Sequence, residues 1–146
     1  MIRIEIKIEL NPTEDSDKII KVMSNFTNFN KDTVQIDKIS EGYYLYTVIA
    51  YGRDSLQTMF TGLRNQRIVE SARKYLMSKR KENSVSFMLN KQALYMNKFH
   101  FCYTPEESPM GPVWIRIESD NIIRILEYLV PHTIKGKPQE VDYIPE

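Results

Sequence analysis

Cysteine, histidine and glycine are scarce in this chain of 146 residues. The single cysteine, Cys102, cannot form an intrachain disulfide, and no pair of cysteines suggests a zinc or redox site. His100 and His132 lack the spacing of zinc ligands, and a His-X-Cys pair alone is weak evidence for a metal. The five glycines match neither the dinucleotide-binding nor the nucleoside-triphosphate-binding fingerprint. We therefore expect no metal and no cofactor.

Long apolar runs are also absent. No stretch approaches the roughly 20 apolar residues that a membrane-spanning helix needs. From Ile2 to Leu10 apolar and charged residues alternate strictly, whereas a signal peptide has a continuous apolar segment. We interpret this start as a half-buried strand. These features predict a cytoplasmic protein with no membrane partner.

Positive charge is concentrated in one part of the chain, although the formal net charge is only +1. Residues 53–98 hold ten Lys or Arg and three acidic side chains, a formal charge of +7. Residues 1–52 carry −2 and residues 99–146 carry −4. A local positive field attracts phosphates, whereas a solubilising surface usually mixes its signs. The basic segment is therefore either a surface for a polyanion or a solvated helix face.

Strand and helix patterns alternate along the chain without a repeat, a low-complexity tract or a linker. Period-two patterns predict strands at residues 1–10, 33–39, 43–51, 84–89, 98–103 and 113–119. Helical spacing predicts helices at residues 19–26, 56–63, 63–81 and 122–129, with Thr13 or Ser16 as the first cap and Gly62 as a break or kink. The sequence predicts a single α+β domain over residues 1–146, with a C-terminal tail from about residue 132 that packs as an extended segment or frays.

The helix expected over residues 63–81 is amphipathic. Its apolar residues, from Ile68 to Leu76, form a buried stripe, and its cations lie mainly on the opposite face. The side chains that we expect to contact RNA phosphates are Arg64, Arg67, Arg73, Lys74, Arg80 and Lys81, together with Lys91 further along the chain. Gln66 lies among them and either orders the guanidiniums or contacts the ligand.

A polar turn, Asn90-Lys91-Gln92, directly follows a predicted strand. Side chains at such a position can contact phosphates, sugars or base edges, although the turn could equally be structural. Arginine pairs with two phosphate oxygens and lysine adds a point charge. We therefore expect a composite anion site in which Arg64 or Arg67 is joined by Lys91 or Gln92.

Aromatic residues suggest a further surface. The side chains that could stack on bases, if their sheet face is open, are Tyr44, Tyr46, His100, Trp114 and Arg116. The alternative is that these residues cover a second core layer. The glycine-aromatic signature of the common RNA-recognition sheet is absent.

Catalytic motifs are missing as well. Ser108 lies in a loop without the helix-start elbow of a serine nucleophile. Active sites can be assembled from distant residues, so a hydrolase or nuclease remains a third hypothesis with no supporting constellation.

Five ordered motifs carry a family resemblance, and they occupy residues 11–15, 63–73, 87–93, 109–112 and 131–136. Over nearly its whole length the chain resembles a small archaeal family of uncharacterised proteins described as predicted RNA-binding and exosome-linked. The resemblance implies a single two-layer α+β domain similar to ribosomal protein five of the large subunit, with helices packed on one face of a curved mixed sheet. Residues 94–97 replace a smaller, glycine-containing stretch, which argues against a ligand that needs close backbone approach there.

We expect a non-catalytic RNA-binding protein, linked to RNA processing, that prefers RNA shape or single strands to a defined sequence. The alternative is a protein-interaction module, accessory to an RNA-processing complex, whose basic helix meets an acidic protein. The sequence leaves open whether the chain forms a homo-oligomer.

Overall fold

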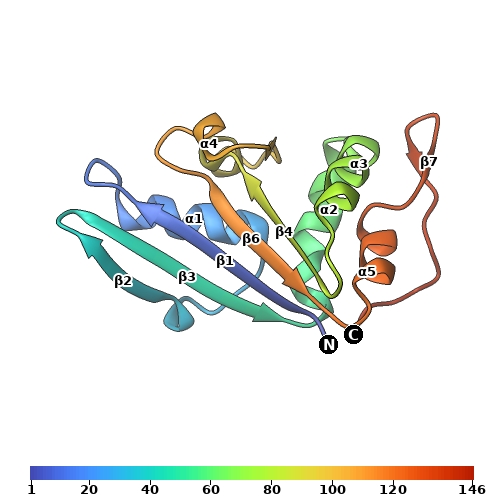
Figure 1. Cartoon of the computed structure of the whole chain (residues 1–146), viewed down its shortest axis with the longest axis horizontal. Helices are drawn as coiled ribbons and strands as arrows, with labels where there is room; N and C mark the ends of the chain where they lie inside the picture. The colour runs from blue at the N-terminus through green and yellow to red at the C-terminus, as the bar shows by residue number, and fades with distance from the viewer.

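The computed structural model describes all 146 residues. Its six main strands are β1 (Arg3–Leu10), β2 (Gln35–Ser40), β3 (Tyr43–Tyr51), β4 (Ser84–Leu89), β5 (Phe101–Cys102) and β6 (Val113–Glu118). They form one sheet in the order β2-β3-β1-β6-β4-β5. The N-terminal strand β1 pairs with both β3 and β6, so it lies inside the sheet (Figure 1).

The α+β class and the two-layer domain are confirmed, and one detail of the expected sheet is wrong. Every strand pair is antiparallel, whereas the resemblance implied a mixed sheet. The physical reason lies in the connections. Strands β2 and β3 form a hairpin around Gly42, whose φ of 81° suits glycine, and the helical connections return each later strand antiparallel to its neighbours.

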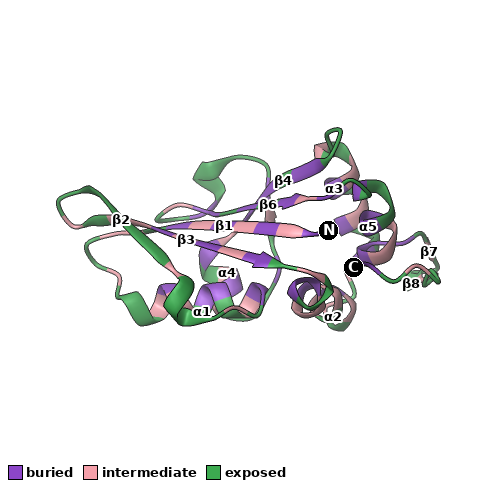
Figure 2. Cartoon of the chain, turned by 90° about the horizontal axis from the view of Figure 1, so that it is seen from below, coloured by how far each residue is buried: buried purple, intermediate pink, exposed green.

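Five α-helices accompany the sheet: α1 (Ser16–Phe26), α2 (Gln57–Asn65), α3 (Val69–Lys79), α4 (Lys91–Tyr95) and α5 (Ile122–Leu129). Figure 2 shows α1, α2 and α4 on one side of the strands. Helices α3 and α5 lie to the right of β4 in Figure 1. Three short 3₁₀ turns occupy Lys31–Thr33, Arg53–Leu56 and Pro105–Glu107. None of these helices combines the length and hydropathy of a membrane span.

The core lies between the helices and one face of the sheet. The alternation in β1 places Ile4, Ile6 and Ile8 on that face with no exposed surface, while Glu5 and Lys7 point to the other face. Each such side chain contributes about 1.5–3 kcal/mol when it is fully buried. The opposite sheet face has no helix layer (Figure 1).

The ends of the helices differ in part from the sequence prediction. Asp15, rather than Thr13 or Ser16, caps α1, because its carboxylate accepts a hydrogen bond from the Lys18 backbone N–H at 2.9 Å. The boundary between the helices expected over residues 56–63 and 63–81 lies further along the chain, because residues 63–65 belong to α2 and α3 begins only at Val69. The chain breaks at Arg67, which adopts a φ of 60°.

Gly62 lies inside α2 and does not break it. A Cβ atom at this position would clash with Cε2 of Phe99, whose side chain is buried in the core. The glycine therefore serves close packing of α2 against Phe99.

The chain after α5 packs instead of fraying. It forms a small hairpin from β7 (Thr133–Ile134) and β8 (Lys137–Pro138), with Gly136 at a φ of 80° in the turn. Tyr143 packs against the core and Pro145 is buried. Residues 132–146 thus contact the rest of the chain through this hairpin, Tyr143 and Pro145.

The contact between Gly62 and Phe99 makes a testable prediction. Replacing a glycine in a helix interior by alanine usually stabilises a protein by roughly 0.5–1 kcal/mol. Gly62→Ala should instead destabilise the protein by about 1–3 kcal/mol, because the added methyl group overpacks the core. Urea unfolding measures this change, and Thr61→Ala, at an exposed position of the same helix, is the control. A higher unfolding midpoint for Gly62→Ala would contradict this view of the packing.

Candidate nucleic-acid interface

Arg64 is committed to the interior of the structure. Its Nε and one Nη2 hydrogen donate to the carboxylate of Glu140, at 2.9 and 2.8 Å. The other guanidinium hydrogens donate to the carbonyl oxygens of Phe60, Leu129 and Tyr128, at 3.1, 2.9 and 3.2 Å. All five N–H donors of an arginine are then in use. These bonds join α2 to the end of α5 and to the tail, and no donor remains for a phosphate.

Arg73 is held in a similar way. Its guanidinium forms two hydrogen bonds of 3.0 Å with the carboxylate of Glu127. It also donates to the carbonyl oxygen of Val130 at 2.9 Å and lies 2.9 Å from Nε2 of His132. Arg73 therefore anchors α5 and the start of the tail to α3.

Gln66 and Asn90 also have structural partners. The amide of Gln66 exchanges two hydrogen bonds with the backbone of Phe99, at 2.9 and 2.8 Å. Asn90 caps α4 by accepting a hydrogen bond from the Ala93 N–H at 2.8 Å, and its amide donates to the carbonyl of Glu107 at 3.1 Å. Gln66 thus orders the backbone near Phe99, and not the guanidiniums around it.

The expected phosphate contact from Lys91 is wrong, because the side chain of Lys91 is only 1% exposed. Its Nζ donates to the carbonyl oxygens of Glu9 and Met110, both at 2.7 Å, and to Oε1 of Glu14 at 3.0 Å. The side chain of Glu14 is 2% exposed. Lys91 and Arg64 belong to separate hydrogen-bond networks and do not form the expected composite site together. The pairing of Arg67 with Gln92 stays a prediction.

Burial and pairing act in opposite directions on this ion pair. Burial lowers the pKa of the Lys91 ammonium, and the hydrogen bond and charge of Glu14 only partly offset that effect. Burial tends to raise the pKa of Glu14, but hydrogen bonds from Asn11 and Lys91 outweigh it, so this pKa lies below its ordinary value. The second oxygen, Oε2, has no hydrogen bond and lies 3.2 Å from Nζ of Lys18.

Four exposed cations of the predicted site form no ion pair, and they are Arg67, Lys74, Arg80 and Lys81. The uncharged Gln92 is exposed as well. Arg67 precedes α3, Lys74 lies within it, and Arg80 and Lys81 follow its last residue. The four cations therefore extend along and beyond one helix. We name these four residues the α3 cations.

Two lysines that the sequence did not indicate as site residues lie beside Arg67. A cleft of about 630 Å³ lies between the turn that precedes α3 and the β7–β8 hairpin, and its walls include Arg67, Lys135 and Lys137. Both lysines are exposed. Their charges were hidden by the net negative C-terminal segment, and only the folded hairpin places them beside α3.

The suggested stacking residues divide between the two faces of the sheet. Tyr46 pairs with Ile8 in register, is buried on the covered face, and donates a hydrogen bond to Ser16 at 3.0 Å. Tyr44 is two residues away on the same face. Trp114 and Arg116 point to the uncovered face, and His100 is an exposed residue outside the strands.

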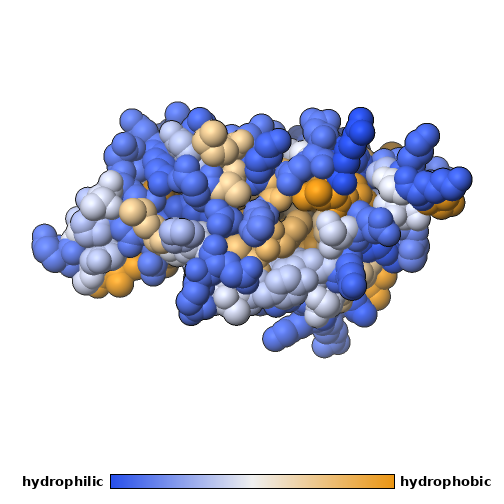
Figure 3. Space-filling model, turned by 90° about the horizontal axis from the view of Figure 1, so that it is seen from above, coloured by the Kyte–Doolittle hydropathy of each residue, from blue (hydrophilic) through white to orange (hydrophobic).

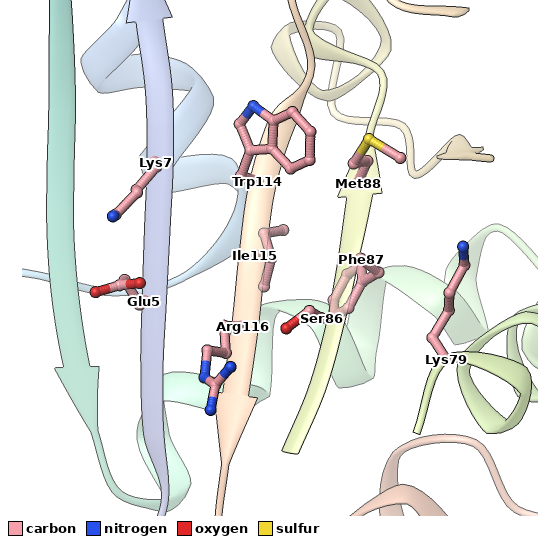
Figure 4. Close-up of a pocket in the computed structure, with 9 residues that line it drawn as sticks. All are labelled: Glu5, Lys7, Lys79, Ser86, Phe87, Met88, Trp114, Ile115 and Arg116. Atoms are coloured by element: carbon pink, nitrogen blue, oxygen red, sulfur yellow. The ribbon is translucent and has the colours of Figure 1, made fainter. Parts of the chain in front are cut away.

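The uncovered face contains a hollow of about 240 Å³. Figure 4 shows Lys7 on β1, Trp114 and Arg116 on β6, and Met88 on β4 around it, with Lys79 at the end of α3. Figure 3 views the molecule from above and not onto this face. It shows a largely hydrophilic surface with some apolar side chains near its middle.

Cys102 and Ser108 are both buried. Burial raises the pKa of the Cys102 thiol, which disfavours a thiolate nucleophile. Ser108 is buried, accepts a hydrogen bond from the Lys91 N–H and donates to the carbonyl of Gly111, both at 2.9 Å. No cluster of three potential metal-binding side chains occurs in the structure.

Comparisons with known proteins agree on one family. A family model described as RNA binding matches residues 3–119. A UPF0201 protein of Metallosphaera sedula is 33% identical over 147 aligned residues, which cover 100% of this chain and 99% of that protein. A UPF0201 protein of Saccharolobus solfataricus is 34% identical, with 94% of this chain and 93% of the relative covered.

Solved structures give the same result. The crystal structure of a UPF0201 protein from Methanococcus jannaschii matches with a TM-score of 0.76 at 25% identity, covering 93% of this chain and 98% of that one. A second UPF0201 crystal structure has a TM-score of 0.72 at 32% identity, with the same coverage. The names of these relatives include neither an exosome nor a ribosomal protein, so those two implications of the resemblance stay predictions.

The buried pair can be tested by removing one partner. Lys91→Met leaves the Glu14 carboxylate buried without its closest cation, which should cost about 3–5 kcal/mol of stability. Lys18→Met removes the more exposed partner of the same carboxylate and should cost less than Lys91→Met, because Glu14 keeps its hydrogen bonds from Asn11 and Lys91. Urea unfolding of both variants measures the two costs. Equal costs would show that Lys91 is not the residue that compensates Glu14.

The lowered pKa of Glu14 predicts a dependence of stability on pH. A carboxylate with a lowered pKa in the folded state stabilises it above the ordinary pKa of 4.5, and this contribution is lost as the pH falls through the lowered value. The free energy of unfolding should therefore fall less steeply below about pH 4.5 in Glu14→Gln than in the parent protein. Glu82→Gln, at an exposed position, should keep the parent slope.

Proposed function

The chain belongs to the family whose model is described as RNA binding, and from this membership we propose that it binds RNA through the α3 cations without catalysing a reaction. The supporting observation is that Arg67, Lys74, Arg80 and Lys81 are exposed and form no ion pair, in contrast to Arg64 and Arg73. Phosphate groups attract such cations and release counterions on binding.

Lys135 and Lys137 extend this surface across the cleft beside Arg67. An RNA backbone that follows the α3 cations then has two more lysines within the same basic area. Gln92 is exposed on α4, and we include it in this proposal only as a separate polar contact. The resemblance to exosome-linked proteins supports RNA processing as the setting.

A protein-interaction module is the second candidate. Strand β2 forms an edge of the sheet, and its Ile36 and Ile39 are 52% and 53% exposed. Edge strands with exposed apolar residues pair readily with other chains. An acidic protein could meet the α3 cations in the same complex. Association with a partner that survives nuclease treatment, while the purified protein ignores RNA, would favour this candidate.

Charge reversal tests the RNA proposal. The triple variant Arg67→Glu, Lys74→Glu and Lys81→Glu should lower the affinity for a mixed RNA pool at least about ten-fold at low salt, because its side chains no longer neutralise phosphates. Fluorescence anisotropy over a salt series measures the affinity. For single strands, the log–log salt dependence should become shallower by about 0.7 for each phosphate that the variant leaves without a cation.

The matched control changes the net charge equally at exposed sites away from α3, with Lys31→Glu, Lys38→Glu and Arg53→Glu. This control should retain most of the affinity. Equal reductions in the two triple variants would mean that total charge, and not the α3 cations, governs binding. No detectable binding of the parent protein at low salt would remove the proposal.

A further inference from the structure

The uncovered sheet face presents an aromatic side chain where a sheet protein would ordinarily bury or avoid one. Trp114 is the only tryptophan of the chain, and it is 43% exposed. In register it lies between Lys7 on β1 and Met88 on β4. Met88 is 8% exposed, so this row combines an apolar floor with an accessible indole. Arg116 follows on the same face of β6.

Cations outnumber acids around the hollow beside Trp114. Lys7 forms no ion pair, and Arg116 uses its Nε to bind Glu118 at 3.0 Å, which leaves both Nη groups available. Lys79 lies with its Nζ 5.5 Å from the ring centre of Tyr75. The one acid in the lining, Glu5, has an oxygen 3.5 Å from Nη2 of Arg3. The hollow therefore has an apolar, aromatic floor and a positive rim.

We propose that this hollow binds an unpaired nucleobase of single-stranded RNA, stacked on Trp114, with the adjoining phosphates near Lys7, Arg116 and Lys79. Every base has a π-face that stacks on an aromatic ring, and a guanidinium plane serves the same purpose. An apolar peptide would gain nothing from the cations, and duplex RNA keeps its base faces inside the stack. Aromatic surface and positive charge together fit a single-stranded nucleotide.

The position of Lys79 connects this hollow with the α3 cations. Lys79 is the last residue of α3, directly before Arg80 and Lys81, and it also lines the hollow. One strand could therefore contact the helix through its phosphates and the sheet through a base. The inference rests on the proposed function, because it names the class of RNA and adds a second surface to the first.

The single tryptophan provides a direct readout. Titration with an unpaired oligoadenylate of about eight nucleotides should quench Trp114 fluorescence. This length lies within the usual site size of domains that bind single-stranded nucleic acids. Anisotropy of the labelled oligonucleotide measures the affinity independently. The same sequence in a duplex should leave the fluorescence unchanged.

Two substitutions at this position separate stacking from packing. Trp114→Thr keeps a residue that favours strands and removes the ring, and it should weaken oligoadenylate binding about ten-fold, as expected when one base loses its stacking partner. Trp114→Phe keeps an aromatic face and should stay within about three-fold of the parent affinity. Unchanged urea midpoints for both variants confirm that folding is not the cause.

The outcomes distinguish this inference from the broader proposal. If the oligonucleotide binds by anisotropy while Trp114 fluorescence and the Trp114→Thr affinity stay at parent values, the hollow is not a base site and RNA binding by the α3 cations stands. If neither the oligonucleotide nor a mixed RNA pool binds at low salt, both fail. A last outcome is that Trp114 fluorescence changes with protein concentration in the absence of RNA and that sedimentation shows a dimer. In that case a second copy covers the hollow and the inference is wrong.

Discussion

The buried ammonium of Lys91 is the constraint on which one end of the fold depends. A charged group without exposure needs an acceptor for each of its hydrogens, and here these come from Glu9 at the end of β1, from Glu14 before α1 and from Met110 before β6. None of these three segments adjoins Lys91 in the sequence. The ammonium is satisfied only when strand ends, helix start and loop meet at one point. Three of the five motifs behind the family resemblance, residues 11–15, 87–93 and 109–112, meet there, so these motifs identify a fold.

The same reasoning divides the basic segment into two kinds of charge. Arg64 and Arg73 hold α5 and the tail through carboxylates and carbonyl oxygens, whereas the α3 cations have no protein partner. A formal charge of +7 over residues 53–98 therefore overstates the field that reaches a ligand. The tail partly restores it, because the hairpin that carries Lys135 and Lys137 is positioned by the contact between Arg64 and Glu140 that follows it. Structural arginines thus help to build the cleft without binding in it.

Sequence patterns predicted the elements better than their long-range partners. Alternation identified β1, β3, β4 and β6 because one face of each is buried, and helical spacing identified the apolar side of α3. The partners of Lys91 were out of reach, since two of its acceptors are backbone carbonyls, which every residue possesses. The sequence also could not place Tyr46 and Trp114 on opposite faces, because alternation gives the parity within a strand and only the register relates one strand to another.

Charges on an exposed part of a sheet normally limit aggregation with other chains. Much of this face carries charges of both signs, from Arg3, Glu5 and Glu118. The row from Lys7 through Trp114 to Met88 departs from that pattern, because its charge is of one sign and its remaining surface is apolar. Such a row contributes little to the free energy of folding, because an indole that is 43% exposed lacks much of the stabilisation that full burial gives. The departure has a physical use only when something covers the ring. On the proposed function that covering group is a base, and the fold then separates the two parts of RNA recognition: the helix attracts the backbone by charge, and the sheet accepts the base by stacking.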